Sequence, residues 1–259
     1  MLSVLELLAI DAGKAILEVY NAGPNVSYKE DCSPVTEADE RAEAIILAGL
    51  SKAYPDIPVV AEESVAAGRV PDVSGGRFFL VDPLDGTKEF INRRDDFTVN
   101  IALVEDGVPV AGIVYAPAKG TAYTGFAGKA EKLAVTDAQA ITDRQPIECR
   151  KHDGALTAVA SRSHNSPETE AFLAEKGISS TKSVGSSLKF CLVAEGEADV
   201  YPRFGRTMEW DTAAGDAVLR AAGGLTLDPE GNAFRYGKTS QPTDSDFANG
   251  HFIAWGCNR

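Results

Sequence analysis

The sequence has few cysteines and no long apolar run, and each shortage argues against a class of protein. Its 259 residues include four cysteines, with no C-x-x-C pair and no histidine at zinc-ligand spacing. Neither a disulfide framework nor a structural zinc site is expected, and the thiols are those of a reduced, cytoplasmic protein. No stretch is long enough to span a bilayer, and no basic region precedes the apolar first ten residues. An integral membrane segment and a signal peptide are therefore not expected.

Basic residues are also in short supply. The chain has 25 Lys and Arg against 38 Asp and Glu, a formal charge of −13. This balance argues against nucleic acid, or an anionic membrane surface, as a non-specific partner. A small anionic substrate could still bind where divalent cations and local basic side chains reverse the potential. Peripheral association with the inner membrane face stays open, as does the choice between monomer and homodimer.

The sequence contains no internal repeat, low-complexity tract or linker, so its parts are expected to pack on one another. A polar stretch at about 136–154 separates a strand-rich first part from alternating strands and helices. We predict an N-terminal lobe over 1–150 and a C-terminal lobe over 151–259. The predicted helices span about 2–21, 36–53, 167–176, 186–195 and 212–222, and the predicted strands about 57–61, 78–82, 98–104, 110–115, 121–126, 157–160, 199–201 and 252–254.

The most informative segment is the nine-residue run DPLDGTKEF at 82–90. The apolar run 78–81 before it predicts a buried strand, which Pro83 is expected to end. Gly86, Thr87 and Lys88 then form a turn into a helix, whose backbone N–H groups would face a bound anion. Two carboxylates in such a turn, Asp82 and Asp85, favour a bound cation, because buried like charges need neutralisation. Oxygen ligands beside an anion site suit Mg²⁺ and a phosphoryl group, and the Leu84 carbonyl is a further candidate ligand.

Three other acidic residues attract notice, and each has a structural interpretation. Asp39 follows Thr36 by three residues in a capping-box pattern. Asp211 precedes a helix that it could N-cap. Glu62 follows an apolar strand, where acidic residues are usually solvated. Taken singly, these residues are more often structural than functional.

Four segments together carry a specific resemblance. SPVTEAD at 33–39, the glutamates at 62–63, DPLDGTKEF and EWDTAAG at 209–215 resemble the ordered signature of the lithium-sensitive, Mg²⁺-dependent inositol monophosphatase superfamily. DGTKEF, ASRSH at 160–164, GSSLKFCLVAEG at 185–196 and YPRFG at 201–205 resemble its 3'(2'),5'-bisphosphate nucleotidases of the CysQ type. The resemblance implies an α+β fold, the layered α-β-α-β-α sandwich of the sugar phosphatases, which include fructose-1,6-bisphosphatase-like proteins. The metals would lie between the lobes.

The resemblance also implies roles for individual residues. Thr87 and Asp39 are similar to a catalytic dyad in which the carboxylate holds the hydroxyl and the hydroxyl orients the attacking water. Glu62 is implied in catalysis as well as in metal binding, and Gly86 and Thr87 would present N–H groups to the phosphate. The implied ligands of two or three Mg²⁺ ions are Glu62, Asp82, the Leu84 carbonyl, Asp85 and Asp211.

A bisphosphate nucleotide carries a second phosphate away from the metals. Lys189 and Arg203 are the candidates to hold it, and Ser186, three residues before Lys189 on a predicted helix, would face the same ligand. His164 could contact the nucleoside. The substrate-binding residues expected are Gly86, Thr87, Lys88, His164, Ser186, Lys189, Arg203 and Asp211.

The implied reaction is hydrolysis of the 3'-phosphate of adenosine 3',5'-bisphosphate, or of its sulfated parent, to give AMP and phosphate in the first case. The resemblance places this reaction in sulfate assimilation. Two alternatives stay open. An inositol or sugar monophosphatase would share the metal site, and a non-catalytic phosphate-binding regulatory protein would keep the cleft without turnover.

Overall fold

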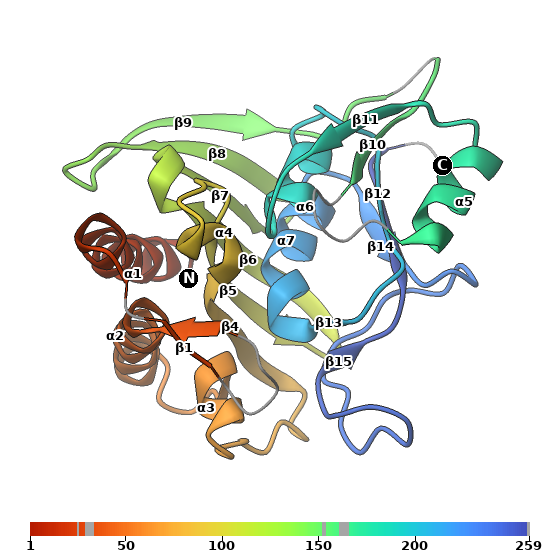
Figure 1. The fold of residues 1–259 in the computed structure, drawn as a ribbon. Helices are drawn as coiled ribbons and strands as arrows, with labels where there is room; N and C mark the ends of the chain where they lie inside the picture. Colours follow the sequence, from red (N-terminus) through yellow and green to blue (C-terminus); the bar gives the residue numbers. More distant parts are fainter. Residues whose placement is uncertain (25, 29–33, 152–153, 161–165, 258–259) are drawn as a thin grey trace.

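In the computed structural model, the described chain comprises residues 1–259 except 25, 29–33, 152–153, 161–165 and 258–259. Five layers follow one another across the molecule: a helix pair, a large sheet, a second helix pair, a smaller sheet and a last helix (Figure 1). The predicted α-β-α-β-α sandwich is confirmed. The helices are α1 (Leu2–Ala22), α2 (Glu37–Ala53), α3 (Glu62–Ala66), α4 (Thr87–Ile91), α5 (Pro167–Glu175), α6 (Leu188–Ala194) and α7 (Glu209–Ala221), with a 3-10 turn at Pro117–Lys119.

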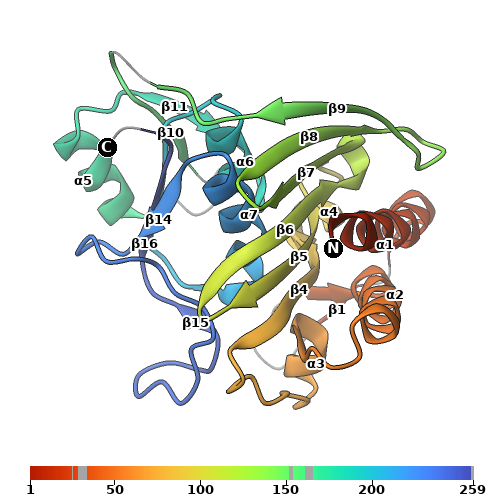
Figure 2. The same cartoon turned by 180° about the vertical axis from the view of Figure 1, so that it is seen from behind.

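The large sheet has seven strands in the order β3-β4-β5-β6-β7-β8-β9, antiparallel except for the β3/β4 pair (Figure 2). Helices α1 and α2 cover one face, and their amphipathic stripes bury a first apolar core against it. The strands are β3 (Val59–Ala61), β4 (Arg77–Asp85), β5 (Thr98–Glu105), β6 (Val108–Ala116), β7 (Thr121–Phe126), β8 (Lys129–Val135) and β9 (Ile141–Ile147).

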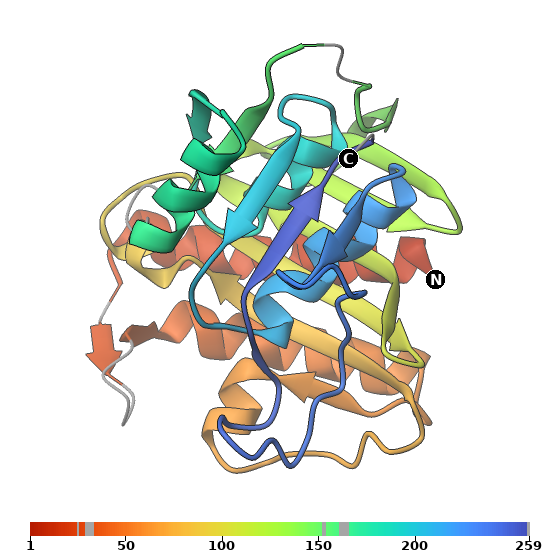
Figure 3. The same ribbon diagram turned by 90° about the vertical axis from the view of Figure 1, so that its right-hand side faces the viewer.

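The smaller sheet has five strands in the order β11-β10-β12-β16-β14. Helices α6 and α7 lie between the two sheets over the largest core, and α5 packs on the outer face of the smaller sheet (Figure 3). Its strands are β10 (Thr157–Ala160), β11 (Ser180–Ser183), β12 (Val200–Arg203), β14 (Leu225–Leu227) and β16 (Phe252–Trp255). Two short pairs complete the chain: β1 (Val26–Tyr28) with β2 (Pro34–Thr36), and β13 (Thr207–Met208) with β15 (Ala248–Asn249).

Helix α7 lies unusually close to the large sheet because two strand positions that face it are glycines. A Cβ atom at Gly112 would lie 2.7 Å from the Ala214 carbonyl oxygen, and one at Gly125 would lie 2.6 Å from the Val218 Cα. Any side chain at either position would push the helix away. The two glycines therefore allow the close packing of α7 on the large sheet and so help to fix the position of Asp211.

Several predicted boundaries differ from the structure, and three of these differences bear on the site. Strand β4 does not end at Pro83 but runs to Asp85, because a register shift between Asp82 and Asp85 removes the need for a ladder N–H from proline. Helix α6 begins at Leu188, after Ser186, which has a φ of 45°. Helix α7 begins at Glu209, so Asp211 lies inside its first turn.

The structure also contains short elements that were not predicted: α3, β1, β2, β11, β13, β14 and β15. A larger omission lies in the segment 129–147. Strands β8 and β9 were not predicted, and β9 falls within the stretch read as polar. Five of the seven β9 residues are exposed, so this edge strand lacks the apolar alternation that would reveal it. The division into lobes at residue 150 stays a prediction. No helix in the described part of the chain is long and apolar enough to cross a bilayer.

Candidate active site

A cavity of about 510 Å³ opens where the end of β4 meets the starts of α6 and α7. Nine of the predicted site residues line it, and they come from segments separated by up to 149 positions, from 62 to 211. The structure thus brings together residues that the sequence holds far apart. The nine are Glu62, Asp85, Gly86, Thr87, Lys88, Ser186, Lys189, Arg203 and Asp211.

Four carboxylates form the negative end of this site. Asp82 is 2% exposed, and its pKa is raised well above the ordinary value, first by burial and then by the charges of Glu62, Asp85 and Asp211. Burial, followed by the charges of Asp85 and Glu62, likewise raises the pKa of Asp211. Burial raises the pKa of Asp85, although Lys189 and two hydrogen bonds from Ser187 act in the opposite direction. The carboxylates therefore destabilise one another's ionised forms.

This arrangement is consistent with a bound divalent cation. Among the described residues, no group of three or more His, Cys, Asp or Glu side chains is arranged so that it could hold a metal ion by itself. Magnesium does not need one, because it keeps several waters and binds through a few carboxylates. A cation among these four groups would offset the like-charge repulsion that helps to raise the pKa values of Asp82 and Asp211. The residues thus fit Mg²⁺, with Glu62, Asp82, Asp85 and Asp211 as the available carboxylates.

Asp39 and Thr87 meet at the edge of the cavity. Asp39 is 2% exposed and accepts hydrogen bonds from the Thr36 N–H at 2.8 Å and the Thr36 hydroxyl at 2.7 Å, both through Oδ2. The Thr87 hydroxyl lies 3.3 Å from Asp39 Oδ1 and 3.3 Å from the Leu84 carbonyl oxygen. Burial raises the pKa of Asp39 to about 6. Asp39 is thus both a helix cap and the hydrogen-bond partner of Thr87.

Lys189 and Arg203 form the positive end of the cavity. Lys189 Nζ donates to the Ser186 carbonyl oxygen at 2.7 Å and lies 5.6 Å from the centre of the Tyr201 ring. Burial, and to a lesser extent the charge of Arg203, lowers the pKa of Lys189 to about 8. The Nε atom of Arg203 is buried and has no hydrogen-bond partner among the described residues. Two neighbouring cations with an unpaired donor indicate a site for an anion.

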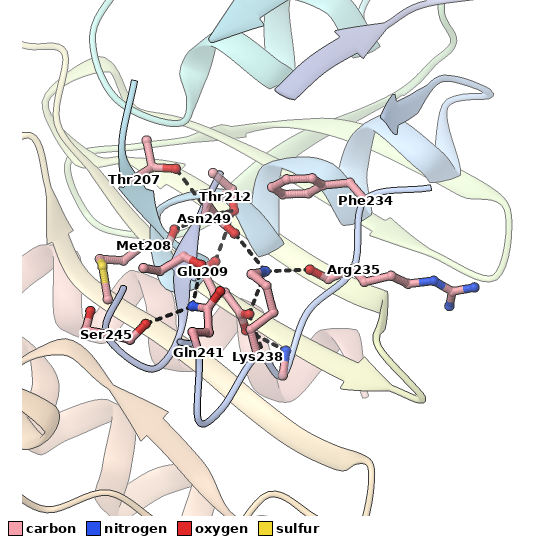
Figure 4. Close-up of polar contacts among 12 residues, drawn as sticks. Thr207, Met208, Glu209, Thr212, Phe234, Arg235, Lys238, Gln241, Ser245 and Asn249 are labelled. Carbon is pink, nitrogen blue, oxygen red and sulfur yellow. Dashed lines mark hydrogen bonds and ion pairs between the residues drawn. The ribbon is translucent and has the colours of Figure 1, made fainter. Parts of the chain in front are cut away.

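The start of α7, which carries Asp211, is fastened to the segment 235–249 (Figure 4). The fully buried Glu209 forms a 2.7 Å ion pair with Lys238 and also accepts the Lys238 N–H at 2.9 Å. The Asn249 amide donates to the Met208 carbonyl oxygen at 2.8 Å and to the Thr212 hydroxyl at 3.0 Å. This network fixes the first turn of α7 and therefore the position of Asp211.

Sequence reasoning missed some lining residues. Ser187, Tyr201, Thr207 and Thr212 line the cavity but were not predicted. Ser187, Tyr201 and Thr212 lie within the segments GSSLKFCLVAEG, YPRFG and EWDTAAG, so these motifs could have indicated them; of the serine pair at 186–187, only the first member was chosen. His164 lies outside the described residues. The helical spacing used to join Ser186 and Lys189 was wrong, although the two residues are in contact by the hydrogen bond given above.

Comparison with known proteins gives a consistent result. A sequence model described as the inositol monophosphatase family matches residues 1–252. The 3'(2'),5'-bisphosphate nucleotidase CysQ of Salmonella typhimurium is 47% identical over 240 residues, covering 91% of this chain and 94% of the relative. Its namesake in Escherichia coli K12 is 45% identical over the same length, with the same shares covered.

Solved structures agree with the sequence comparisons. The crystal structure of CysQ from Bacteroides thetaiotaomicron superimposes with a TM-score of 0.79 at 38% identity, covering 97% of this chain and 95% of that one. The Thermotoga maritima IMPase gives a TM-score of 0.75 at 25% identity, with shares of 98% and 91%. With its layered fold, its carboxylate cavity and these similarities, the chain belongs to the inositol monophosphatase family.

Proposed function

We propose that this protein hydrolyses the 3'-phosphate of adenosine 3',5'-bisphosphate to give AMP and phosphate. The observation that carries the proposal is the positive end of the cavity, where Lys189 and Arg203 line the same space as Glu62, Asp85 and Asp211. A monophosphate has no group for this second site. The similarity to proteins named 3'(2'),5'-bisphosphate nucleotidase supports the same substrate class.

Glu62, Asp82, Asp85 and Asp211, with the Leu84 carbonyl, would hold Mg²⁺ in this enzyme. When bound, Mg²⁺ supplies charge stabilisation for the transferring phosphoryl group and for the attacking and leaving oxygens. The residues of the chain itself do the remaining work. Gly86 and Lys88, which line the cavity beside these carboxylates, would contact the phosphate that is removed.

Thr87 and Asp39 would orient the attacking water. The buried Asp39 accepts a hydrogen bond from the Thr87 hydroxyl through Oδ1, which leaves the Thr87 oxygen lone pairs to accept a hydrogen bond from water. A water held in this way loses a proton more readily as it attacks, and such assistance contributes about 100-fold or more to a rate. Asp39 does not contact the water itself; it holds the Thr87 hydroxyl in position.

Lys189 and Arg203 would bind the 5'-phosphate and so place the 3'-phosphate at the carboxylates. Arginine suits this role because its planar fork can grip a phosphate with two parallel hydrogen bonds. The sulfated parent nucleotide carries the same phosphates and would fit the same two ends. The separation between the two ends would select substrates that carry two phosphates.

The test compares phosphate release from adenosine 3',5'-bisphosphate, adenosine 3'-monophosphate and inositol 1-phosphate, each with Mg²⁺ and with EDTA. Arg203→Gln should raise KM for the bisphosphate about 10- to 100-fold, the range for a lost charged hydrogen bond. KM for the 3'-monophosphate should not change. Arg77→Gln, at the exposed far end of β4, is the matched control and should leave both values unchanged.

The two alternatives give different results in this experiment. Preference for inositol 1-phosphate, with no effect of Arg203→Gln on any KM, would make the protein a monophosphatase. Absence of Mg²⁺-dependent release from all three substrates would contradict an enzymatic function and favour a phosphate-binding protein.

A further inference from the structure

Ser187 lies where the proposed ligands from two parts of the fold meet. It is 2% exposed and directly precedes α6. Its N–H donates to Asp85 Oδ2 at 2.7 Å, and its hydroxyl oxygen lies 3.0 Å from the same Oδ2 and 2.7 Å from the Asp211 carbonyl oxygen. One serine thus contacts both the end of β4 and the first turn of α7.

In the part of the chain that the structure describes, the hydroxyl proton of Ser187 has two acceptors within reach, Asp85 Oδ2 and the Asp211 carbonyl oxygen. Asn100, on β5, donates its Nδ2 hydrogen to Ser187 Oγ at 2.8 Å, so the serine oxygen already accepts one hydrogen bond. A hydroxyl has a single proton, which must therefore go to Asp85 or to the Asp211 carbonyl. In either case the proton ties the serine to a proposed ligand residue.

Asn100 holds this position at a cost in stability. It is fully buried, and its Oδ1 atom has no hydrogen-bond partner among the residues that the structure describes. An unpaired amide oxygen in the interior is unfavourable, and each such atom calls for an explanation. The hydrogen bond from Asn100 Nδ2 to Ser187 Oγ explains why an asparagine is kept at this position.

Capping of α6 does not explain Ser187. A serine before a helix usually accepts a hydrogen bond from an N–H of the first turn. The Ser187 side chain makes no such bond, and its hydroxyl contacts Asp85 and Asp211 instead. The side chain is therefore used between elements and not within its own helix.

We propose that Ser187 is a positioning residue that fixes Asp85 relative to the start of α7, with Asn100 orienting its hydroxyl. Asp85 and Asp211 come from different elements. The distance between their carboxylates therefore affects how tightly the two residues together can bind Mg²⁺. This inference rests on the proposed function, because it takes Asp85 and Asp211 as Mg²⁺ ligands.

The test is Ser187→Ala, which removes the hydroxyl and keeps the N–H to Asp85. Mg²⁺ binding is measured by calorimetry on the substrate-free protein, together with kcat and KM at saturating Mg²⁺. We expect Mg²⁺ affinity to fall at least tenfold, about the low end of the range for losing a group that supports a metal ligand. KM for the nucleotide should stay constant. Ser187→Thr, which keeps a hydroxyl, should recover most of the affinity.

Two further variants keep the test decisive. Thr124→Val deletes another fully buried hydroxyl, on β7, which has no hydrogen-bond partner among the described residues. This variant should leave Mg²⁺ affinity unchanged. Asn100→Leu removes both the donor to Ser187 and the unpaired oxygen. Asn100→Leu should weaken Mg²⁺ binding without lowering the melting temperature. This variant tests the proposal if Ser187→Ala does not fold.

The outcomes separate this inference from the proposed function. Unchanged Mg²⁺ affinity in both Ser187→Ala and Asn100→Leu, with an active parent protein, would overturn the positioning role alone. A parent protein that binds Mg²⁺ but hydrolyses no nucleotide would overturn the proposed function, and the loss of affinity in Ser187→Ala would still support the positioning role.

Discussion

Helices α2 and α7 each deliver an aspartate to the cavity from the same place, the third residue of the helix. Asp39 and Asp211 both accept the backbone N–H of the residue before the helix, Thr36 or Met208, at 2.8 Å through Oδ2. Their surroundings differ. Asp39 accepts the Thr36 hydroxyl on Oδ2 and the Thr87 hydroxyl on Oδ1, whereas Asp211 has its pKa raised by burial and by the charges of Asp85 and Glu62.

The comparison shows that capping and chemistry are not competing interpretations of an aspartate. A carboxylate has two oxygens, and the cap occupies only one of them. In Asp39 the second oxygen faces a hydroxyl, and in Asp211 the carboxylate is left among other acids. The same local motif therefore supplies an orienting group in one place and a proposed metal ligand in the other.

Asp211→Asn should reduce activity more than any other variant proposed for these two helices. Asparagine keeps an oxygen for the Met208 N–H, so the helix start should survive, but a neutral ligand weakens metal binding. We expect phosphate release to fall well beyond about 100-fold, more than for a group that only supports a ligand. Melting in EDTA should be unchanged or higher, because a buried repulsive charge is gone. A variant that keeps activity at low Mg²⁺ would contradict the role of Asp211.

Asp39→Asn should give the next largest loss. The cap to Thr36 can remain, whereas the acceptor for the Thr87 hydroxyl is weakened, and we expect kcat to fall about 100-fold. The KM for the nucleotide and the Mg²⁺ affinity should change little, which distinguishes this variant from Asp211→Asn. Thr87→Ser, which keeps the hydroxyl, should retain more activity than Thr87→Val. Equal activities in these two variants would contradict the dyad.

The pKa of Asp39 also predicts a pH dependence of stability in the metal-free protein. Burial raises this pKa to about 6 in the folded state, against about 3.9 in an unfolded chain. Between these values the folded protein keeps a proton that the unfolded chain releases. Relative to Asp39→Asn, the parent should therefore lose stability as pH rises from 4 to 6, by on the order of 3 kcal/mol. Parallel urea unfolding in EDTA measures this difference, and a constant difference across this range would refute it.

The α7 start should depend on contacts from outside the helix. Met208, the residue before α7, has no side-chain hydroxyl to cap the helix. The ion pair between Glu209 and Lys238 instead holds the first turn of the helix in place. Lys238→Met leaves the buried Glu209 carboxylate without its cation, and we expect the free energy of unfolding to fall by about 2 kcal/mol. This is less than for a fully buried pair, because Lys238 is partly exposed. Lys176→Met, in an exposed pair with Glu175, is the control and should have little effect. Chemical denaturation of both variants gives the comparison.

Thr36→Val should give the smallest effect. The Thr36 hydroxyl accepts the Ala38 N–H at 3.2 Å and donates to Asp39, and removing such a cap costs about 1 kcal/mol. Phosphate release should fall much less than in Asp39→Asn, because Oδ1 still faces Thr87. A loss of activity as large as that of Asp39→Asn would show that the two oxygens do not have separate roles.

The sequence predicts contiguous parts of this site better than assembled ones. DPLDGTKEF holds Asp82, Asp85, Gly86 and Thr87 within nine residues, so spacing alone indicates a cation and a phosphate. Ser187 could not be predicted in the same way, because its role depends on contacts with Asp85 and Asp211, 102 and 24 positions away.

The errors in the fold have a similar origin. Strand β9 is an exposed edge strand whose pairing with β8, and not its own composition, makes it a strand. Pro83 normally ends a strand, but here a register shift accommodates it. Long amphipathic helices such as α1 and α2 were predicted to within one residue at each end, because their apolar periodicity is local.

That register shift in β4 also makes the site sensitive to chain length. Asp82 pairs with Asn100 and Asp85 with Thr98, so three steps along β4 match two along β5. Side chains alternate between the faces of a strand, and residues three apart normally point in opposite directions. The extra residue restores a common side for Asp82 and Asp85. Deleting either residue between them would turn one carboxylate away while every acidic residue stayed in the sequence, so an intact motif composition with a shortened spacing would mark a protein that has lost this chemistry.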